Sequence, residues 1–502
     1  MGQAGGFKTI VGCNGKDDTI ILYSKFLKKE RLGRFMNRLS TAIVSMILLV
    51  LPPLLLAQNG KSFRGADDRF KVDILVVVAH PDDEGAVTPY LARAIYDLHK
   101  RVAVVYGTHG GSGGNSYGKE RAGALADIRE IEARDACARL GIKNVWFLDG
   151  KDTASQNVLN SLASWGHGAN LERMVQLIRL TRPEIVIASM PGIFIGENHG
   201  DHQTTGVLAT EAFDLAGNPA AFPEQVAGAS PQREVYLENL GLWQASKLYF
   251  YPDANNEKQF AGSGPAYSSL EVSPSQKKPY WRLALDAGLT HLTQYPGEIE
   301  HISRLSDAEI EKMMQDPEQG WWTDPETLIF GKSVVGGKST DDVFANVTTR
   351  NPLGANLGGT ELRWEPGPAR MVIGGPWGFY ASFLPEHGLS NLPEAKVPEI
   401  GVKAGSQVYV PLVIRHVAGE AMPIKIQAEV PAGWKVTSGA GEFELPAEDV
   451  TELRVQIDTP ALTAEEWKKA EPEAITVRAE SKGKPLGEVK LRVQLRQSAL
   501  PQ

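Results

Sequence analysis

The sequence predicts an α/β protein in which a Rossmann-like, mostly parallel sheet domain precedes an all-β, Ig-like sandwich domain. From residue 72 to about 215, short apolar runs alternate with amphipathic helical patterns, which is typical of strands buried on both faces of a parallel sheet. From about residue 397, apolar and polar residues alternate without intervening helices, which is typical of a sandwich. The length of 502 residues is enough for two or three domains.

Residues 1–57 are predicted to be a secretory signal peptide. Five Lys and Arg side chains between residues 28 and 38 precede the apolar run TAIVSMILLVLPPLLLA, which ends at Ala57. The run has 17 residues and contains two prolines, whereas a transmembrane helix needs about 20 apolar residues. We therefore expect cleavage after Ala57, a secreted or periplasmic protein and no stable transmembrane anchor, with a membrane-anchored form as the alternative. Met36 begins a more ordinary signal peptide and is an alternative start, which would leave residues 1–35 without a structural role.

Charge and cysteine content narrow the class of protein further. The formal net charge is −8, and residues 1–57 carry eight basic but only three acidic side chains, so the remaining chain is more acidic still. We therefore expect no nucleic-acid partner. The chain has two cysteines, and Cys13 lies in the predicted signal peptide, so Cys137 cannot form an internal disulfide after cleavage.

The first folded domain is expected over residues 70–339. Its strands are predicted at residues 72–79, 101–108, 144–149, 184–190 and 247–252. Helices are predicted at residues 91–98, 119–140, 171–180, 283–292 and 307–314. Parallel strands place their carboxyl ends at one edge of the sheet, so functional side chains are expected there.

The remaining chain is expected to form a connection and a second domain. Residues 340–392 are rich in Gly, Pro and Asn, and we expect an irregular connection. Residues 397–497 contain five runs with a period of two, which are VYVPLVI, IKIQAEV, ELRVQID, AITVRAE and VKLRVQL. Turn sequences such as PAGW and SKGKP separate them, so a β-sandwich is predicted.

The sequence AHPDDE directly follows the first predicted strand. His80 is followed by Pro81 and by three consecutive acids, Asp82, Asp83 and Glu84. One interpretation is structural, because proline and acids are favoured in the first turn of a helix. The other is functional, because adjacent carboxylates repel one another unless a cation or a helix terminus holds them.

A second motif, NHGDHQ, follows the fourth predicted strand. It places His199, Asp201 and His202 at the same kind of strand-to-helix junction. A polar turn is the structural alternative, but three of the ten histidines in the chain fall in these two motifs. Two imidazoles and one carboxylate suit Zn²⁺ in an open catalytic site. Asp201, between the two histidines, is suited to orient an imidazole that binds the metal.

The two motifs in this order resemble those of the PIG-L, or LmbE-like, zinc-dependent deacetylases, over about residues 73–294. The resemblance implies one Zn²⁺ per chain, with His80, Asp83 and His202 as metal ligands. It also implies that Asp82 is the general base and that a protonated His199 stabilises the oxyanion. Zn²⁺ makes hydroxide available at neutral pH, and the base returns its proton to the leaving amine.

Further site residues are implied by weaker parts of the same resemblance. The helix with Arg129 and the loop with Asp152 resemble substrate-binding segments, and His291 in HLTQ resembles a segment near the site. The structural alternatives are an ion pair between Arg129 and Glu132 and a core histidine at position 291. The loop GTHGGSGGNS departs from the family pattern, because an acidic residue is expected among its glycines.

The sequence therefore predicts an exported zinc hydrolase that removes an N-acetyl group from an amino sugar or glycoconjugate. The alternatives are a zinc amidase of another small conjugate and a non-catalytic carbohydrate-binding protein. The second is suggested because the last domain, with GWKV at Trp434, resembles the NEW3-like modules of carbohydrate-active enzymes. A nucleotide-binding enzyme is disfavoured because HPDDE replaces the glycine-rich turn after the first strand. A non-haem iron oxygenase is disfavoured because its two-histidine, one-carboxylate site belongs on another scaffold.

Overall fold

The computed structural model describes eleven parts of the chain after the predicted signal peptide. These are residues 66–193, 199–226, 240–251, 260–314, 324–348, 369–392, 397–416, 420–447, 449–463, 466 and 469–496. The predicted signal peptide lies outside the described residues. In the described part of the chain, no helix has both the length and the apolar character that a membrane crossing requires.

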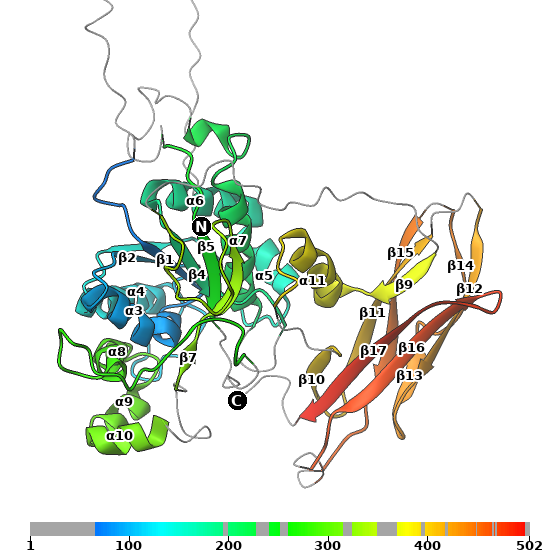
Figure 1. The fold of residues 1–502 in the computed structure, drawn as a ribbon. Coiled ribbons are helices and arrows are strands. Elements are labelled where there is room, and N and C mark those ends of the chain that lie inside the picture. The colour runs from blue at the N-terminus through cyan, green and yellow to red at the C-terminus, as the bar shows by residue number, and fades with distance from the viewer. Residues whose placement is uncertain are drawn as a thin grey trace, which may run out of the picture. The chain divides into compact units, whose positions relative to one another are not determined.

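A six-stranded sheet with the order β3-β2-β1-β4-β5-β8 forms the first domain (Figure 1). Its strands are β1 (Ile74–Val78), β2 (Val102–Tyr106), β3 (Asn144–Phe147), β4 (Ile185–Ser189), β5 (Lys247–Tyr251) and β8 (Ile329–Ser333). The first five strands pair in parallel, and only β8 is antiparallel to its neighbour β5. The prediction of a parallel-dominated α/β sheet is confirmed.

Both faces of this sheet are buried, and β1 shows why its sequence is apolar throughout. Leu75 and Val77 belong to one hydrophobic cluster, whereas Ile74, Val76 and Val78 belong to another on the opposite face. All five side chains are fully buried. Burial of each such side chain contributes about 1.5–3 kcal/mol, so every position of the strand favours this fold.

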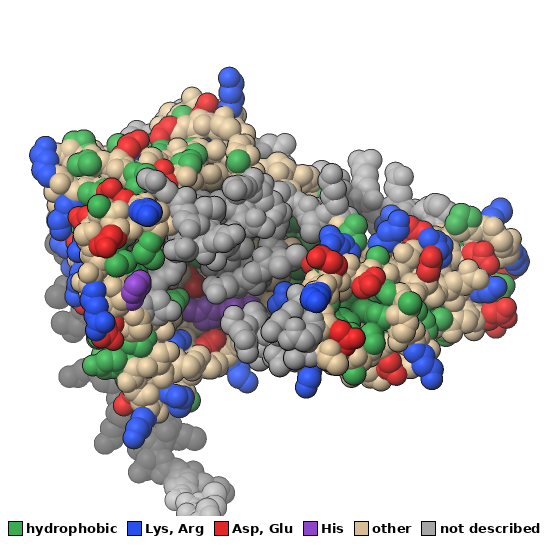
Figure 2. Space-filling view, turned by 90° about the horizontal axis from the view of Figure 1, so that it is seen from below, with side chains coloured by type: hydrophobic (Ala, Val, Ile, Leu, Met, Phe, Trp, Pro, Cys, Tyr) green, Lys and Arg blue, Asp and Glu red, His purple; other side chains and the backbone are tan. Residues whose placement is uncertain are grey.

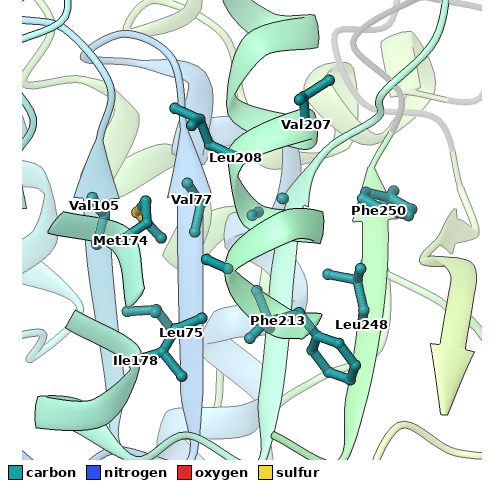
Figure 3. Packing of buried hydrophobic residues seen from close by; sticks show 14 of the residues in the cluster. Leu75, Val77, Val105, Met174, Ile178, Val207, Leu208, Phe213, Leu248 and Phe250 are labelled. Carbon is teal, nitrogen blue, oxygen red and sulfur yellow. The ribbon is translucent and has the colours of Figure 1, made fainter. Parts of the chain in front are cut away.

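Helices cover the two faces. The cluster in Figure 3 is formed with α5 (Val158–Trp165), α6 (His167–Thr181) and α7 (Gly200–Leu215). The opposite face is covered by α3 (Thr88–Tyr96), α4 (Gly123–Arg139) and α8 (Tyr280–Gly288). Smaller elements are the 3₁₀-helices η1 (Asp83–Val87) and η2 (Pro223–Gln225), α9 (Pro296–Ile302), α10 (Asp307–Met314) and the strands β6 (Ala266–Tyr267) and β7 (Glu326–Thr327).

The segment 340–392, expected to be an irregular connection, contains a strand and a helix. Strand β9 (Arg370–Ile373) pairs antiparallel with β11 (Gln407–His416). Helix α11 (Gly375–Glu386) follows it and contributes Tyr380 and Phe383 to the hydrophobic cluster of the first domain. The Gly and Pro content of this segment predicts no helix. The helix α11 forms there because it packs against another part of the chain.

The C-terminal part consists of β-strands, as the alternating pattern predicts. One sheet has the order β10-β17-β16-β12-β14 and the other β13-β15-β11-β9. The remaining strands are β10 (Glu399–Lys403), β12 (Met422–Glu429), β13 (Lys435–Ser438), β14 (Gly441–Leu445), β15 (Asp449–Asp458), β16 (Glu473–Ser481) and β17 (Lys484–Arg496). Side chains from both sheets form one hydrophobic cluster, which includes Trp434. An Ig-like sandwich remains a prediction.

The pairing of β9 with β11 leads to a stability prediction. Met371 is 3% exposed and lies in the core of the C-terminal sheets, whereas its neighbour Val372 is 39% exposed. We expect Met371→Ala to lower the free energy of unfolding by about 2–5 kcal/mol, because it leaves a cavity in that core. The control Val372→Ala should change it by less than about 0.5–1 kcal/mol. Urea denaturation followed by circular dichroism tests this. Equal effects of the two substitutions would contradict the placement of Met371 in that core.

Candidate active site

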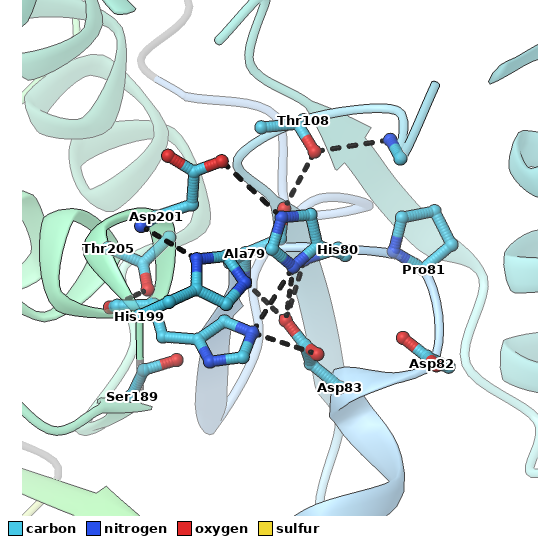
Figure 4. Close-up of polar contacts among 12 residues, drawn as sticks. Ala79, His80, Pro81, Asp82, Asp83, Thr108, Ser189, His199, Asp201 and Thr205 are labelled. Carbon is cyan, nitrogen blue, oxygen red and sulfur yellow. Dashed lines mark hydrogen bonds and ion pairs between the residues drawn. The ribbon is translucent and has the colours of Figure 1, made fainter. Parts of the chain in front are cut away.

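The sheet topology brings the two sequence motifs together. Strands β1 and β4 are adjacent and parallel, so the chain leaves both at the same edge of the sheet. His80 follows β1 after one residue, and His199 is the N-cap of α7, which follows β4. A Cβ on Gly206 of α7 would lie 2.4 Å from the Ser189 carbonyl oxygen, so glycine is needed for helix and strand end to approach this closely. Figure 4 shows the resulting cluster.

The three predicted metal ligands lie in mutual contact. His80 Nδ1 is 3.2 Å from His202 Nε2 and 3.4 Å from Asp83 Oδ2, and His202 Nε2 is 3.3 Å from Asp83 Oδ1. Ligands about 2.0–2.1 Å from a tetrahedral Zn²⁺ would lie about 3.3–3.4 Å from one another. These side chains therefore fit a divalent cation. Among the described residues, two further combinations could hold a cation, His80 with His199 and His202, and His80 with Asp152 and Asp201.

Asp83 also has a structural role, because it holds the turn between β1 and η1. Its Oδ2 accepts hydrogen bonds from the backbone N–H groups of Ala79, at 3.0 Å, and His80, at 2.7 Å. The 3₁₀-helix η1 begins at Asp83. Asp82, immediately before it, has φ of 108°, a left-handed conformation that costs energy for a residue with a side chain. One carboxylate thus shapes the turn and faces the two imidazoles.

The far nitrogen of His80 faces two carboxylates. His80 Nε2 is 3.3 Å from Asp152 Oδ1 and 3.5 Å from Asp201 Oδ2. Asp201 is fully buried and accepts hydrogen bonds from the backbone N–H and the hydroxyl of Thr153, at 2.7 and 2.8 Å. The imidazole that Asp201 contacts is therefore that of His80. Asp152, predicted to bind substrate, also contacts His80 and accepts a hydrogen bond from the Ser112 backbone N–H at 2.7 Å. Whether it also touches substrate stays a prediction.

The carboxylates determine the charges in this cluster. Burial opposes a charge on His80, but Asp83, Asp152 and Asp201 together raise its pKa well above the usual value. Burial also opposes a charge on Asp83, but His202 and His80 hold the pKa of that carboxyl well below its usual range. A divalent cation at His80 would displace a proton from the ring, so its binding should release protons.

Asp82 is a carboxylate beside the cluster rather than within it. Burial and the neighbouring charge of Asp83 raise its pKa to about 7. Its Oδ2 accepts a hydrogen bond from the Tyr295 hydroxyl at 2.6 Å, and its backbone N–H donates to Glu84 Oε2 at 3.1 Å. Figure 4 draws no contact from Asp82 to the imidazoles. A carboxylate with a pKa near neutrality is suited to take up and return a proton.

His199 lies against the other two rings, with ring centroids 4.2 Å from His202 and 5.1 Å from His80. Burial and these two neighbouring rings lower its pKa to about 4. The prediction that His199 is protonated therefore disagrees with the structure at neutral pH. Its Nδ1 accepts a hydrogen bond from the Asp201 backbone N–H at 3.3 Å, so the neutral ring carries its proton on Nε2. A neutral N–H can still donate a hydrogen bond to an oxyanion.

Arg129 is 6% exposed and holds the glycine-rich loop beside the site. Its guanidinium donates to the carbonyl oxygens of Gly110, at 2.7 Å, and Gly114, at 2.8 Å. A Cβ on Gly113 would lie 2.6 Å from its Nη1, and Gly110 has a positive φ of 69°, so glycine is favoured at both positions. Glu132 accepts two hydrogen bonds from Thr293, from its backbone N–H and from its hydroxyl. The two side chains therefore do not form the surface pair considered above, and a substrate contact of Arg129 stays a prediction.

Residues 291–295 form a further wall of the site. His291 Nε2 lies 2.7 Å from Glu84 Oε1, and Gln294 donates to the Pro81 carbonyl oxygen at 2.7 Å. His291 is thus buried and supports the turn after β1 through Glu84. Glu84 and Tyr295 are further residues beside the site that the sequence motifs do not mark as functional. Both residues lie in or next to the motifs HPDDE and HLTQ, which was the only hint of a role in the site. Nothing in the sequence near either motif shows that the two segments meet.

In the space-filling view, histidine side chains reach the surface beside acidic ones (Figure 2).

We expect Arg129→Lys to lower the free energy of unfolding by about 1–3 kcal/mol. A single ammonium group cannot donate to both loop carbonyls at once, so a buried acceptor loses its donor. Arg139→Lys, on the exposed side of the same helix, should change it by about 0–1 kcal/mol. Chemical denaturation of the full chain measures both values. If Arg129 acted only on substrate, its stability effect would match that of the control and only KM would rise.

The fold and the site together define the type of domain. Residues 75–213 match the family model PIG-L, GlcNAc-PI de-N-acetylase, and this range contains both motifs. The chain therefore carries a PIG-L domain at residues 75–213.

Parts of this chain are similar to two curated proteins and one solved structure that are named deacetylases. The chain is 25% identical over 242 residues to 1D-myo-inositol 2-acetamido-2-deoxy-alpha-D-glucopyranoside deacetylase of Thermobifida fusca. This alignment covers 44% of this chain and 82% of the relative. It is 29% identical over 195 residues to the corresponding deacetylase 1 of Frankia casuarinae, covering 35% of this chain and 57% of the relative. Among solved structures, N,N'-diacetylchitobiose deacetylase from Pyrococcus horikoshii is 17% identical, with a TM-score of 0.35, and the alignment covers 60% of this chain and 93% of that chain.

Proposed function

We propose that this protein is an exported, zinc-dependent hydrolase that removes the N-acetyl group from an amino sugar or glycoconjugate. The observation that supports it most is the meeting of His80, Asp83 and His202 at distances suited to a tetrahedral cation. The relatives named above are deacetylases of 2-acetamido-2-deoxy sugars, which supports this substrate class. Export rests on the predicted signal peptide alone.

The side chains present account for the steps of amide hydrolysis. One Zn²⁺ held by His80, Asp83 and His202 would supply a Lewis acid that makes water a better nucleophile at neutral pH. Asp82 accepts the proton of the attacking water and then delivers it to the leaving amine, for which its pKa of about 7 is well placed. The neutral His199 donates its Nε2 proton as a hydrogen bond to the oxyanion that develops on the acyl carbon. Asp152 and Asp201 keep His80 oriented with Nδ1 toward Asp83 and His202.

The alternatives make different demands on the same residues. A carbohydrate-binding protein without activity would not need Asp82, a half-buried carboxylate that lies outside the proposed ligand set and whose negative charge is disfavoured by partial burial and by Asp83. Trp434, the residue of the NEW3-like resemblance, is only 8% exposed and lies in a hydrophobic core, so stacking of a sugar on it would require the core to open. A zinc amidase of another small conjugate uses the same chemistry, so only substrates distinguish it.

The test is a substrate comparison with the chain beginning at Gln58 and loaded with Zn²⁺. N-acetylglucosamine oligomers and glycoconjugates are incubated with the protein, and free amine and acetate are both measured. N-acetylated amino acids and O-acetylated sugars serve as comparison substrates. We expect equal amounts of amine and acetate from the N-acetylated sugars only, and no turnover by the His80→Ala variant. Preferred cleavage of the amino acid amides would favour the second alternative.

A further inference from the structure

The helix α11 belongs to the chain after the PIG-L domain, yet its side chains contact both ends of α7, the helix that begins with the motif histidines. Tyr380 of α11 donates a hydrogen bond from its hydroxyl to Gln203 Oε1 at 2.9 Å. Gln203 directly follows His202 and is 1% exposed, and Tyr380 is 6% exposed. The bond therefore lies in the protein interior, at the first turn of α7.

A second contact holds the other end of the same helix. Asp214, near the end of α7, contacts the Lys332 ammonium, and its Oδ2 lies 2.7 Å from His387 Nδ1 at the end of α11. The Lys332 ammonium also donates to the His387 carbonyl oxygen at 2.8 Å. Gln203 and Asp214 are about 16 Å apart along a helix, so α11 holds α7 at both ends.

Apolar side chains of both helices also belong to one large buried cluster. Tyr380, Phe383 and Leu384 of α11 belong to the same buried cluster as Val207 and Leu208 of α7. The preceding strand β9 is paired into the C-terminal sheet, and the Gly374 backbone N–H donates to the Pro411 carbonyl oxygen at 2.9 Å. The start of α11 is therefore held in place by the C-terminal sheet.

We propose that Tyr380 is a positioning residue that fixes the first turn of α7, and with it His202, through its hydrogen bond to Gln203. The proposal rests on the proposed function only in treating His202 as a metal ligand. Its physical basis is general: when a buried donor is removed, the hydrogen bond that it made is lost, and the backbone around the acceptor opens more often.

The first measurement needs neither metal nor substrate. Hydrogen exchange of the metal-free full chain is compared between the parent protein and Tyr380→Phe, with peptides that cover α7 and β1. We expect exchange in the first two turns of α7 to become on the order of five- to tenfold faster, while β1 keeps its rate. The second measurement is competition for Zn²⁺ with a chromogenic chelator, for which we expect a Kd on the order of five- to tenfold higher, below the effect of changing a group that touches a ligand.

The chain offers a matched control. The Tyr409 hydroxyl donates to Gln407 Oε1 at 2.9 Å, the same donor, acceptor and distance, but Tyr409 is 50% exposed on β11. Tyr409→Phe should leave α7 exchange and the Kd for Zn²⁺ within twofold of the parent. In a Gln203→Met background, Tyr380→Phe should have little further effect, because the hydrogen bond that it removes is already absent.

Several outcomes would overturn the proposal. They are unchanged α7 exchange in Tyr380→Phe, an equal acceleration in α7 and β1, and additive effects of the Tyr380 and Gln203 substitutions. Faster α7 exchange with an unchanged Kd for Zn²⁺ would also overturn it, because His202 would then not depend on this contact. Failure of the deacetylation assay together with the expected exchange result would instead reject the proposed function and leave the positioning of α7 intact.

Discussion

Replacement of Asp82 by asparagine is expected to abolish most of the activity while the metal stays bound. The substitution keeps the size of the side chain and leaves His80, Asp83 and His202 unchanged. The amide oxygen can still accept the hydrogen bond from the Tyr295 hydroxyl, so the strained turn at Asp82 keeps this support. An amide cannot take up the proton of the attacking water, and general base catalysis contributes about 10²- to 10⁴-fold. We expect kcat to fall by at least about 100-fold, with KM little changed.

Steady-state kinetics and elemental analysis of the same preparation measure this result. Asp127→Asn, an exposed aspartate on α4, is the control and should retain full activity and metal. Loss of metal from Asp82→Asn would show that Asp82 is a ligand and that the roles of Asp82 and Asp83 are interchanged. Full activity with metal bound would mean that the acids after His80 only shape the turn.

Replacement of His202 by alanine is expected to remove both the metal and the activity. His202 would supply one of three protein ligands, and its Nε2 lies within 3.3 Å of donor atoms of both other ligands. Changes of groups that only support a ligand cost about 10- to 100-fold in metal affinity, so loss of a ligand should cost more. Elemental analysis after dialysis should find less than about one tenth of the parent metal content.

His301→Ala is the matched control, because His301 is exposed on α9 and lies outside the cluster. It should retain metal and turnover. If His202→Ala keeps its metal, the combination of His80 with nearby carboxylates becomes the better assignment, since Asp152 and Asp201 also surround His80. Loss of metal from both variants would point instead to general destabilisation, which the control is designed to reveal.

Local sequence patterns determined much of the fold and the main site residues. The uninterrupted apolar run at β1 requires burial on both faces, and that requirement leads to a parallel sheet covered by helices. A parallel sheet places strand ends at one edge, so the two motifs could be expected to meet once their strands were neighbours. The alternation after residue 397 likewise predicts β-structure. A period of two is a local pattern within each strand, so it can be recognised without knowing which strands pair.

Tertiary structure alone decided which distant groups meet and what they do. The sequence did not reveal that Arg129 holds the carbonyls of a glycine-rich loop, or that Tyr295 reaches Asp82, because these contacts join segments many residues apart. Burial next to two other imidazoles makes His199 neutral, a charge state that depends on its surroundings rather than on its residue type. The Gly- and Pro-rich sequence around α11 predicts an irregular connection, whereas its apolar side chains join the buried cluster of the first domain; helix propensity is a weak guide when tertiary contacts supply most of the free energy.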